Sequence, residues 1–231
     1  MYKHLDKLLT KEKEKMRTEF NRLDVMGFDE LNVVGVKENT KEMFNRLMAD
    51  NESLYLKVAK KAYSKAKQTA KSAGYEGKES EIDGAWILAA LAGFSLVTGY
   101  LYKQEAERKR LRLNEQILTA REYDNRQMHH DSLRKTANLW WTQTIQYGVS
   151  VVDKATIKAY KDAGVKEVKW VSIGDGKACS DCSGRNGTIY KITEIPEKTH
   201  YGCRCYVVPV KNKGVTERAN IRTNKVSAVQ S

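Results

Sequence analysis

The sequence predicts an α+β protein built predominantly from long α-helices, with a small β module near the C-terminus. Only two prolines occur in 231 residues, Pro196 and Pro209, so no proline interrupts a helix before residue 196. The chain before them is rich in Lys, Glu, Ala, Leu and Arg, which favour helices. Beyond residue 164, short alternating segments rich in Val and aromatic residues favour strands instead.

This change in amino-acid composition, together with the apolar pattern, predicts four regions along the chain. They are an N-terminal helical region (1–82), a helical body (83–165), the β module (166–210) and a flexible C-terminal tail (211–231). The tail has little apolar content, so it is expected to fray or to dock on a partner.

Two amphipathic helices are predicted in the first region. Residues 1–24 carry leucines at helical spacing. A second helix is predicted from about Asn39 to Ser72, and the stretch SAGYEGKESEIDG, with its three glycines, is predicted to be the loop that ends it. The apolar stripe of the second helix comprises Met43, Leu47, Leu54, Leu56, Val58 and Ala62.

Residues 84–102, GAWILAALAGFSLVTGYLY, contain no charged side chain in nineteen positions. That length is compatible with a transmembrane helix. However, three glycines, a serine, a threonine and two tyrosines keep the mean hydropathy slightly below that of a typical span. A buried core helix or a helix-turn-helix is therefore the preferred interpretation.

Helical character continues from residue 102 to residue 163. In the polar stretch 102–127, the apolar side is predicted to consist of Leu111, Leu113, Ile117 and Leu118. Residues 132–163 are predicted to continue as helix, and Gly164, a residue suited to the C′ position, is predicted to end the last helix. Core positions expected in this helix are Trp140, Trp141, Ile145, Val149 and Val152.

The chain is strongly basic, with 41 Lys and Arg against 29 Asp and Glu and a formal net charge of +12. Such a protein is attracted to polyanions, of which nucleic acid and anionic membranes are the obvious examples. Candidate phosphate contacts are Arg108, Lys109, Arg110 and Arg112. The alternative for these four is a solvated face on a basic helix.

All four cysteines lie within residues 179–205, together with one of the four histidines. No apolar secretory signal opens the chain, so synthesis in the reducing cytoplasm is expected, where clustered cysteines indicate metal ligands more readily than disulfides. The candidate ligands are Cys179, Cys182, His200, Cys203 and Cys205.

The spacing C-x2-C followed by H-x2-C-x-C predicts a structural zinc site. Zinc takes four tetrahedral ligands, and a two-residue spacing brings two thiolates to one ion. Cys203 and Cys205 alternate along a predicted strand, so both could face the metal. Five candidates compete for four places, and a small β unit gains from the ion the stability that its own core cannot supply.

Other roles for the cysteines fit less well. Two disulfides would suit a protein outside the cell, and unligated thiols would leave the spacing unexplained. A redox pair would want a following helix in a βαβ pattern. Four or five soft ligands would leave no open position for a catalytic water.

No catalytic set emerges from the sequence. It contains no GxSxG, P-loop, GxGxxG or HExxH motif. His129 and His130 are adjacent on a predicted helix and point about 100° apart, so they cannot chelate one ion as an i, i+4 pair could. Both histidines are therefore expected at the helix surface. Because no catalytic set is found in the sequence, a non-enzymatic protein is predicted.

The C-terminal region resembles a known family. The order is a Trp-containing strand, Asp, C-x2-C, Gly followed by an aromatic, Pro, then H-x2-C-R-C, here KWVSIGDGKACSDCSGRNGTIY…IPEKTHYGCRCYVVP. It resembles the C-terminal module of phage minor head proteins, the Mu-F-like head morphogenesis family. The stretches SLVTGYLYKQEAERKRLRLNEQ and LWWTQTIQYGVSVVDKATIKAYKDAGVKEVKW resemble the preceding helices of minor capsid proteins from phages of Gram-positive bacteria.

The resemblance covers roughly residues 95–210 and departs from the family in two respects. Many members have Pro directly after the His, where this chain has Tyr201. Longer members carry additional domains, some of them toxin-like enzymes, and nothing here resembles one.

The resemblance implies a low-copy protein made in the host cytoplasm and located in the virion head interior. Its implied partners are the portal protein, capsid or scaffold proteins and, without sequence specificity, packaged DNA. A function in head assembly is implied, together with a part in DNA packaging or ejection. Membrane contact would then be confined to ejection, through residues 84–102.

Two other functions are compatible with the residues alone. One is a zinc-knuckle nucleic-acid-binding regulator, although no recognition helix is predicted after the knuckle. The other is a single-span membrane protein with a cytosolic zinc module, since basic residues follow the apolar run.

Overall fold

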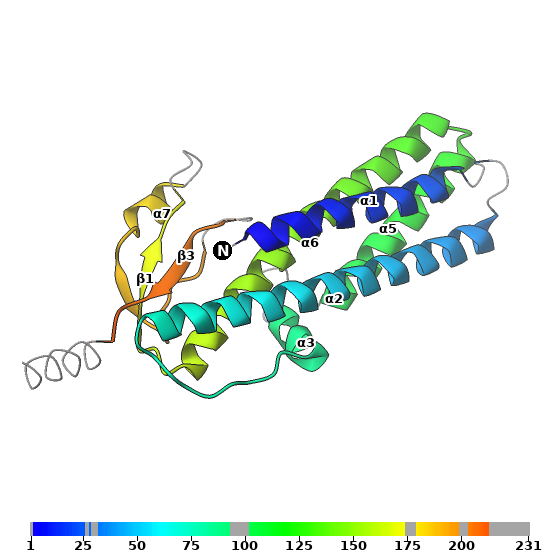
Figure 1. Ribbon diagram of the computed structural model, residues 1–231. Coiled ribbons are helices and arrows are strands. Elements are labelled where there is room, and N and C mark those ends of the chain that lie inside the picture. Colours follow the sequence, from blue (N-terminus) through cyan, green and yellow to red (C-terminus); the bar gives the residue numbers. More distant parts are fainter. Residues whose placement is uncertain are drawn as a thin grey trace, which may run out of the picture. The chain divides into compact units, whose positions relative to one another are not determined.

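The computed structural model of the protein describes residues 2–25, 28, 32–92, 102–173, 179–198 and 203–212 (Figure 1). Within them the chain is mostly helical, with a small three-stranded antiparallel sheet near the C-terminus, which confirms the predicted fold class at that level. The predicted tail from residue 213 onward lies outside the described residues.

The first two helices are α1 (Lys3–Val25) and α2 (Val33–Ser72). The predicted start of the second helix near Asn39 is wrong by six residues, because Asn32 caps an earlier start. The Gly35 backbone N–H donates to Asn32 Oδ1 at 2.7 Å, which satisfies one of the free donors in the first turn.

Two further helices follow α3 (Gly84–Ala92), namely α5 (Tyr102–Glu122) and α6 (Arg126–Asp162). The turn between α5 and α6 places Asp124 in the left-handed region, at φ 47°. Asn125 then caps α6, since its Oδ1 accepts from the Met128 N–H at 2.9 Å. The continuous helical character predicted for residues 102–163 is therefore divided into two helices by this turn.

Two compact units make up the chain. Unit 1 comprises Met1–Lys60 and Ile82–Val152, and unit 2 comprises Lys61–Glu81 and Asp153–Ser231. The long helices α2 and α6 each contribute residues to both units.

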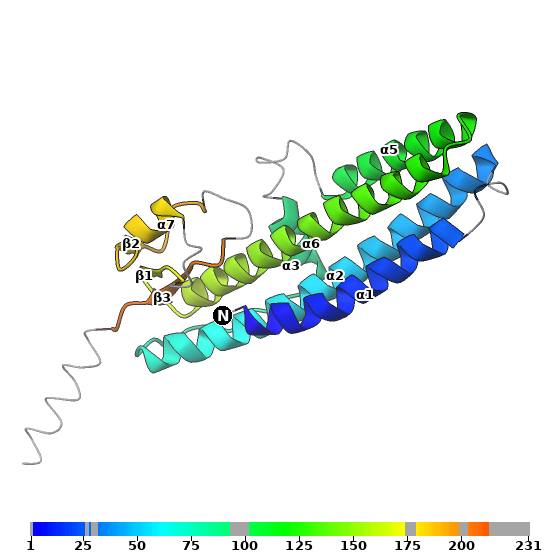
Figure 2. The same cartoon turned by 90° about the horizontal axis from the view of Figure 1, so that it is seen from above.

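Unit 1 is a bundle of four helices in which α1, the first part of α2, α5 and the first part of α6 run alternately up and down (Figures 1 and 2). All four contribute to one apolar core. Its buried members are Met16, Phe20, Leu23, Val36, Met43, Phe44, Leu47, Ala106, Leu113, Ile117, Leu133 and Trp140.

Polar contacts between helices fix the register of this bundle. Arg46 on α2 donates to both carboxylate oxygens of Glu19 on α1, at 3.0 and 2.9 Å. In the interior, Asn51 Nδ2 donates to Thr144 Oγ1 at 3.0 Å. Each of these bonds depends on a particular axial alignment of two helices, because a shift by one turn would leave buried polar atoms without partners.

The predicted apolar side of α5 is wrong at one position. Leu113 and Ile117 are buried, but Leu111 is 52% exposed. Residues two positions apart on a helix point about 200° away from each other, so Leu111 and Leu113 cannot share one face. Trp140 is in the core as predicted, and Trp141 is half-buried with the Lys13 ammonium 5.6 Å from its ring.

The sheet of unit 2 consists of β1 (Glu167–Val171), β2 (Ile189–Lys191) and β3 (Tyr206–Pro209), in the order β2-β1-β3 with both pairings antiparallel. These are the three predicted strands. Val168 and Trp170 alternate onto the buried face of β1, and Trp170 lies opposite Val207.

The end of α6 packs against this sheet within unit 2. The Tyr160 hydroxyl is 3.4 Å from the Val207 carbonyl oxygen, and the small side chains of Ala155 and Ala159 are fully buried. Gly164, at φ 78°, ends the helix as predicted and leads the chain into β1.

Among the described residues, no helix combines the length and apolar character that crossing a membrane requires. The uncharged stretch 84–102 contains α3 and the first residue of α5, while residues 93–101 lie outside the described part. Membrane contact by this stretch during ejection stays a prediction.

Candidate metal centre

The five-residue helix α7 (Ser180–Gly184) positions the first pair of cysteines. Cys179 is its N-cap, and the Cys182 N–H points toward the Cys179 sulfur at an N–S distance of 3.4 Å. This helix is not predicted from the sequence, because serine, aspartate and glycine favour turns over helix.

The second pair of cysteines immediately precedes β3. Cys205 lies directly before the strand that begins at Tyr206, and Cys203 lies three residues before it, so the predicted strand begins after both cysteines. Both thiols are buried, as is that of Cys182. Pairing of β3 with β1 therefore holds the second cysteine pair against the same core that contains Trp170.

Three of the predicted ligands converge. The sulfur atoms of Cys182, Cys203 and Cys205 all lie within 4.8 Å of one another, and those of Cys182 and Cys203 are 3.4 Å apart. Zinc–thiolate bonds of about 2.3 Å in a tetrahedron place sulfur atoms roughly 3.8 Å apart. The cluster could hold a metal ion with little rearrangement.

The two remaining candidates differ from these three. Cys179 is partly exposed and is outside the tight cluster, although its sulfur contacts the Cys182 backbone. His200 lies outside the described residues. A four-coordinate site would need one of these two as its fourth ligand.

Burial controls the protonation of the cluster. It raises the pKa of the Cys182 thiol well above its usual range, and hydrogen bonds with Cys203, Cys179 and Cys205 act in the same direction. Burial also raises the pKa of Cys203, against the opposing effect of a hydrogen bond with the Cys205 backbone. Burial therefore favours the protonated forms of Cys182 and Cys203, and a bound cation would displace their protons and compensate the thiolate charge.

All four cysteines are free thiols in this structure. The short helix α7 contains the second cysteine of the C-x2-C pair and leads into an antiparallel sheet. This is not the βαβ arrangement of a thioredoxin-like redox centre.

The module around the cluster is held by the loop that follows α7. The Gly187 N–H donates to the Trp170 carbonyl oxygen, and the Trp170 N–H donates to the Thr188 carbonyl oxygen, each at 2.9 Å. The Arg185 guanidinium lies 5.5 Å from the centre of the Trp170 ring. These contacts attach α7, and with it Cys182, to the central strand of the sheet.

Lys198 connects the second cysteine pair to α6. Its ammonium donates to the Cys203 carbonyl oxygen at 3.0 Å and lies 2.5 Å from a carboxylate oxygen of Asp153. The positive charge beside the cluster also opposes the effect of burial on the pKa of the Cys203 thiol.

The candidate nucleic-acid contacts on α5 are largely neutralised by their own helix. Glu105 lies 3.1 Å from the Arg108 guanidinium and 2.7 Å from the Lys109 ammonium, and Glu107 pairs with Arg110. The side chains of Lys109 and Arg110 are only 14% exposed, and the Arg112 residue is exposed. Of the four candidate residues, only Arg108 and Arg112 are thus well exposed to a phosphate. Binding of nucleic acid by this part of α5 stays a prediction.

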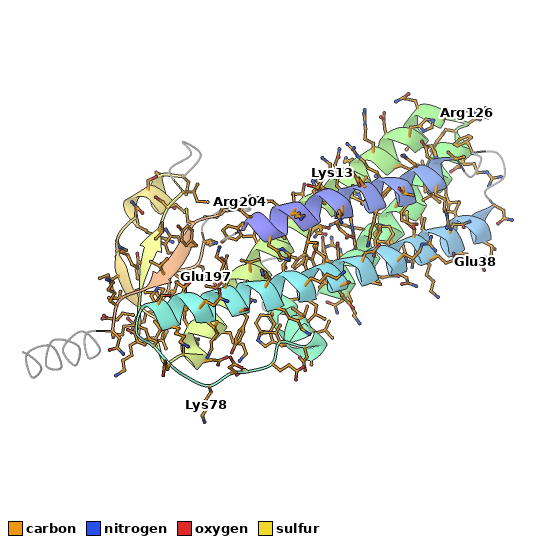
Figure 3. The ribbon with its side chains drawn as sticks, viewed as in Figure 1. Lys13, Glu38, Lys78, Arg126, Glu197 and Arg204 are labelled. Carbon is orange, nitrogen blue, oxygen red and sulfur yellow. The ribbon has the colours of Figure 1, made fainter. Side chains whose placement is uncertain are left out.

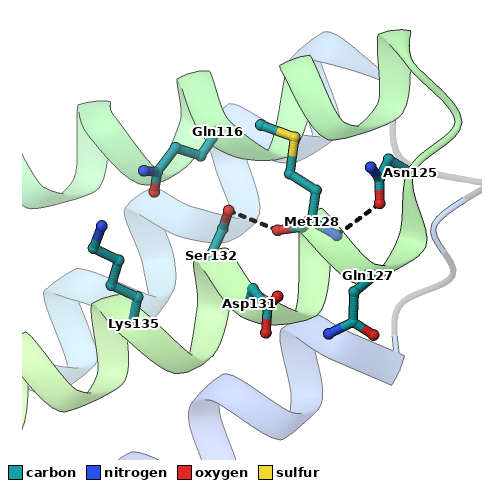
Figure 4. Close-up of a pocket in the computed structure, with 7 residues that line it drawn as sticks. All are labelled: Gln116, Asn125, Gln127, Met128, Asp131, Ser132 and Lys135. Atoms are coloured by element: carbon teal, nitrogen blue, oxygen red, sulfur yellow. Dashed lines mark hydrogen bonds between the residues drawn. The ribbon is translucent and has the colours of Figure 1, made fainter.

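A shallow hollow of about 420 Å³ lies on unit 1 between the ends of α5 and α6 (Figure 4). Its polar lining is occupied in part by the helix itself. Asn125 caps α6 through the Met128 N–H, and Ser132 donates to the Met128 carbonyl oxygen at 2.7 Å. The lining residues are Gln116, Asn125, Gln127, Met128, Asp131, Ser132 and Lys135.

The expectation that both adjacent histidines lie at the surface is wrong for His129, which is only 2% exposed. Its ring packs edge-to-face on Phe28, with the ring centres 5.5 Å apart. His130 is exposed, and its Nδ1 lies 2.6 Å from a carboxylate oxygen of Asp24. Burial lowers the pKa of His129, which favours the neutral ring at this position.

Comparisons of the chain with protein-family models, with curated proteins and with solved structures found no match. The cysteine cluster within unit 2 is accordingly the main structural basis for a functional proposal.

Proposed function

We propose that this protein is a structural, non-enzymatic minor head protein of a phage, associated with the portal inside the procapsid. The observation that carries the proposal is the meeting of CSDC and CRC in one buried cluster beside the Trp170 strand. These are the segments on which the resemblance to head morphogenesis proteins depends. The helical bundle of unit 1 is consistent with the helical region that precedes the module in that family.

Zinc is the proposed metal, and its role is structural. Cys182, Cys203 and Cys205 would supply three thiolates, and Cys179 or His200 the fourth ligand. Soft thiolate ligands favour zinc, and a closed site leaves no position for a reacting water. The ion would fix α7 to the entry of β3, where the three-stranded sheet alone offers a small core.

The proposed partners are the portal protein and capsid or scaffold proteins, with packaged DNA as a non-specific partner. A basic chain suits a DNA-filled shell because phosphate attraction requires no reading of sequence. The protein would be made in the host cytoplasm, reside in the head interior and aid head assembly, with a further part in packaging or ejection.

The test is the protein content of virions. Purified, nuclease-treated virions of the phage whose genome encodes this chain should yield its peptides at low copy relative to the major capsid protein. Genes for a portal protein upstream and a scaffold or major capsid protein downstream are expected. Absence of the chain from both virions and procapsids would overturn the proposal.

A further inference from the structure

The second half of α2 has an unusual charge distribution. Residues 53–72 contain six lysines and no aspartate or glutamate. The first half, residues 33–52, mixes both signs and contains Glu38, Glu42, Asp50 and Glu52. The portion of this helix that belongs to unit 2, residues 61–72, is therefore positively charged only.

Three of these lysines lie on the exposed side of α2 in unit 2. Lys61, Lys65 and Lys71 are exposed, whereas Ala66 and Ala70 are buried. Residues three and four apart share a helix face, so the exposed positions form one surface. We call this surface the α2 lysine face; it comprises Lys61, Ser64, Lys65, Gln68, Lys71 and Ser72.

The lysines of this face have no carboxylate partner among the described residues, unlike Lys158 and Lys198 of the same unit. Lys158 lies 3.1 Å from Asp162, and Lys198 lies 2.5 Å from Asp153. Lys67 has a structural contact instead, since it donates to the carbonyl oxygens of Gly77 and Lys78 at 3.1 and 2.7 Å. Lys61, Lys65 and Lys71 have no comparable contact within the described part of the chain.

Helix stability does not account for this face. A cation stabilises a helix C-terminus only within the last turn, which applies to Lys71 alone. Like charges four residues apart, as at Lys61 and Lys65, destabilise a helix by a few tenths of a kcal/mol. An external anion would remove that repulsion and supply the missing partners.

We propose that the α2 lysine face binds the phosphate backbone of duplex nucleic acid without reading its sequence. Lys61 and Lys71 are ten residues apart, which corresponds to about 15 Å along the helix axis. B-DNA presents one phosphate per strand every 3.4 Å or so along its axis, so several phosphates fall within that length. Lysine is a compact point charge suited to phosphate, and the polar residues between are short or flexible.

Nucleic acid is favoured over a lipid surface by the composition of the same face. Helices that bind at a membrane interface place large apolar or aromatic side chains beside their basic residues. Among residues 61–72 no large apolar side chain is exposed. The face offers charge without an inserting group.

This inference rests on the proposed function for the identity of the ligand in the cell, which would be packaged DNA. The assay itself needs only the purified full chain. Fluorescence anisotropy with a labelled 24-base-pair duplex is measured at several salt concentrations between about 50 and 200 mM. The test variant carries Lys61→Gln, Lys65→Gln and Lys71→Gln, and glutamine preserves helix propensity.

The matched control carries Lys7→Gln, Lys11→Gln and Lys37→Gln, which removes the same charge from exposed positions in segments of mixed sign. Loss of three phosphate contacts should lower the slope of log K against log salt by about 2 to 3 and weaken binding at least about tenfold near 100 mM salt. The control should change both quantities much less. Circular dichroism of each variant checks that the helices are intact.

Equal weakening by the two triple variants would overturn the proposal, since net charge alone would then explain binding. Binding to vesicles of phosphatidylcholine and phosphatidylserine, with none to the duplex, would also overturn it. Neither result would contradict the presence of the chain in virions. Conversely, absence of the chain from virions would not contradict duplex binding by the α2 lysine face.

Discussion

Gly77 occupies a position in unit 2 where any side chain would meet the backbone at the end of α6. A Cβ added there would lie 2.1 Å from the Asp162 carbonyl oxygen and 2.6 Å from the Ala163 Cα. The loop that contains it is held to α2 by Lys67, while the Lys78 side chain projects outward from it (Figure 3). A single residue thus determines how closely this loop approaches α6.

Substituting Gly77 by Ala is expected to reduce the free energy of unfolding by about 1–3 kcal/mol, the usual cost of forcing extra atoms into a packed site. The backbone atoms of α6 cannot move aside as a flexible side chain would. Gly84→Ala is the control, because no atom lies within 4 Å of a Cβ at that position and alanine favours the helix. Urea unfolding followed by circular dichroism measures both, and equal stability of the two variants would contradict the packing argument.

Tyr63 links the same loop to α6 through its hydroxyl, which donates to Asp162 Oδ2 at 2.6 Å and accepts from the Ser80 N–H at 2.9 Å. Burial acts to raise the pKa of Asp162, but the hydrogen bonds from Tyr63 and Lys158 outweigh it and lower that pKa. Stabilisation by the ionised carboxylate is therefore present above the unfolded-state pKa of about 3.9 and is lost as pH falls through the lower folded-state pKa.

Tyr63→Phe is expected to reduce the free energy of unfolding by about 1–3 kcal/mol at pH 7, because it leaves the Ser80 N–H and an Asp162 carboxylate oxygen, both in part-buried hydrogen bonds, without their partner. The difference from the unsubstituted protein should begin to shrink in urea titrations below about pH 4 and should be lost as pH falls through the lower folded-state pKa of Asp162. A difference that is the same at pH 7 and at about pH 2 would show that the ionised carboxylate is not responsible.

Among the secondary-structure elements, α7 and β3 are the two that bring the cysteines together. α7 carries Cys182 at its buried side, and the residues leading into β3 carry Cys203 and Cys205. Neither element is long enough to be stable alone, since a five-residue helix and a four-residue strand bury little apolar surface. A shared metal ion would stabilise both at once.

Elemental analysis of the purified protein should find about one zinc per chain. Cys182→Ser should remove most of that metal, because serine replaces a buried thiolate at the centre of the cluster. Ser183→Ala, on the same helix at an exposed position, should retain it. A metal-free protein with an intact fold and two disulfides would overturn the site.

In the molecule as a whole, two compact units are each assembled from segments far apart in the sequence. Unit 2 unites the ends of α2 and α6 with the sheet, and unit 1 has its own apolar core among four helices. Folding of the sheet should therefore depend on the metal, whereas folding of the bundle should not.

Hydrogen exchange in the presence of a strong chelator tests this independence. Amides of β1 and β3 should lose most of their protection once zinc is removed, while those of α1 and α5 should keep theirs, because their core contains no candidate ligand. The Ser183→Ala variant should respond like the unsubstituted chain. Loss of protection throughout the bundle would show that the units unfold together.

The sequence by itself determined the helical character of the chain, its three strands and the three cysteines that could hold a metal ion. These features follow from local properties: scarce prolines, apolar periodicity, alternation around Trp170, and the spacing of four cysteines. Helix starts were less predictable, because Asn32 and Asn125 act as caps only through bonds to the backbone of the following turn.

Only the tertiary structure decided which of these residues meet. Three thiols converge because β1 pairs with β3 and because the loop after α7 bonds to Trp170, contacts that join segments separated by many residues. The burial of His129 and the exposure of Leu111 likewise depend on which neighbouring helix covers each face. The same holds for charge: acidic residues one turn away pair with Arg108 and Arg110 of α5, while the lysines of the α2 lysine face have no ion pair among the described residues.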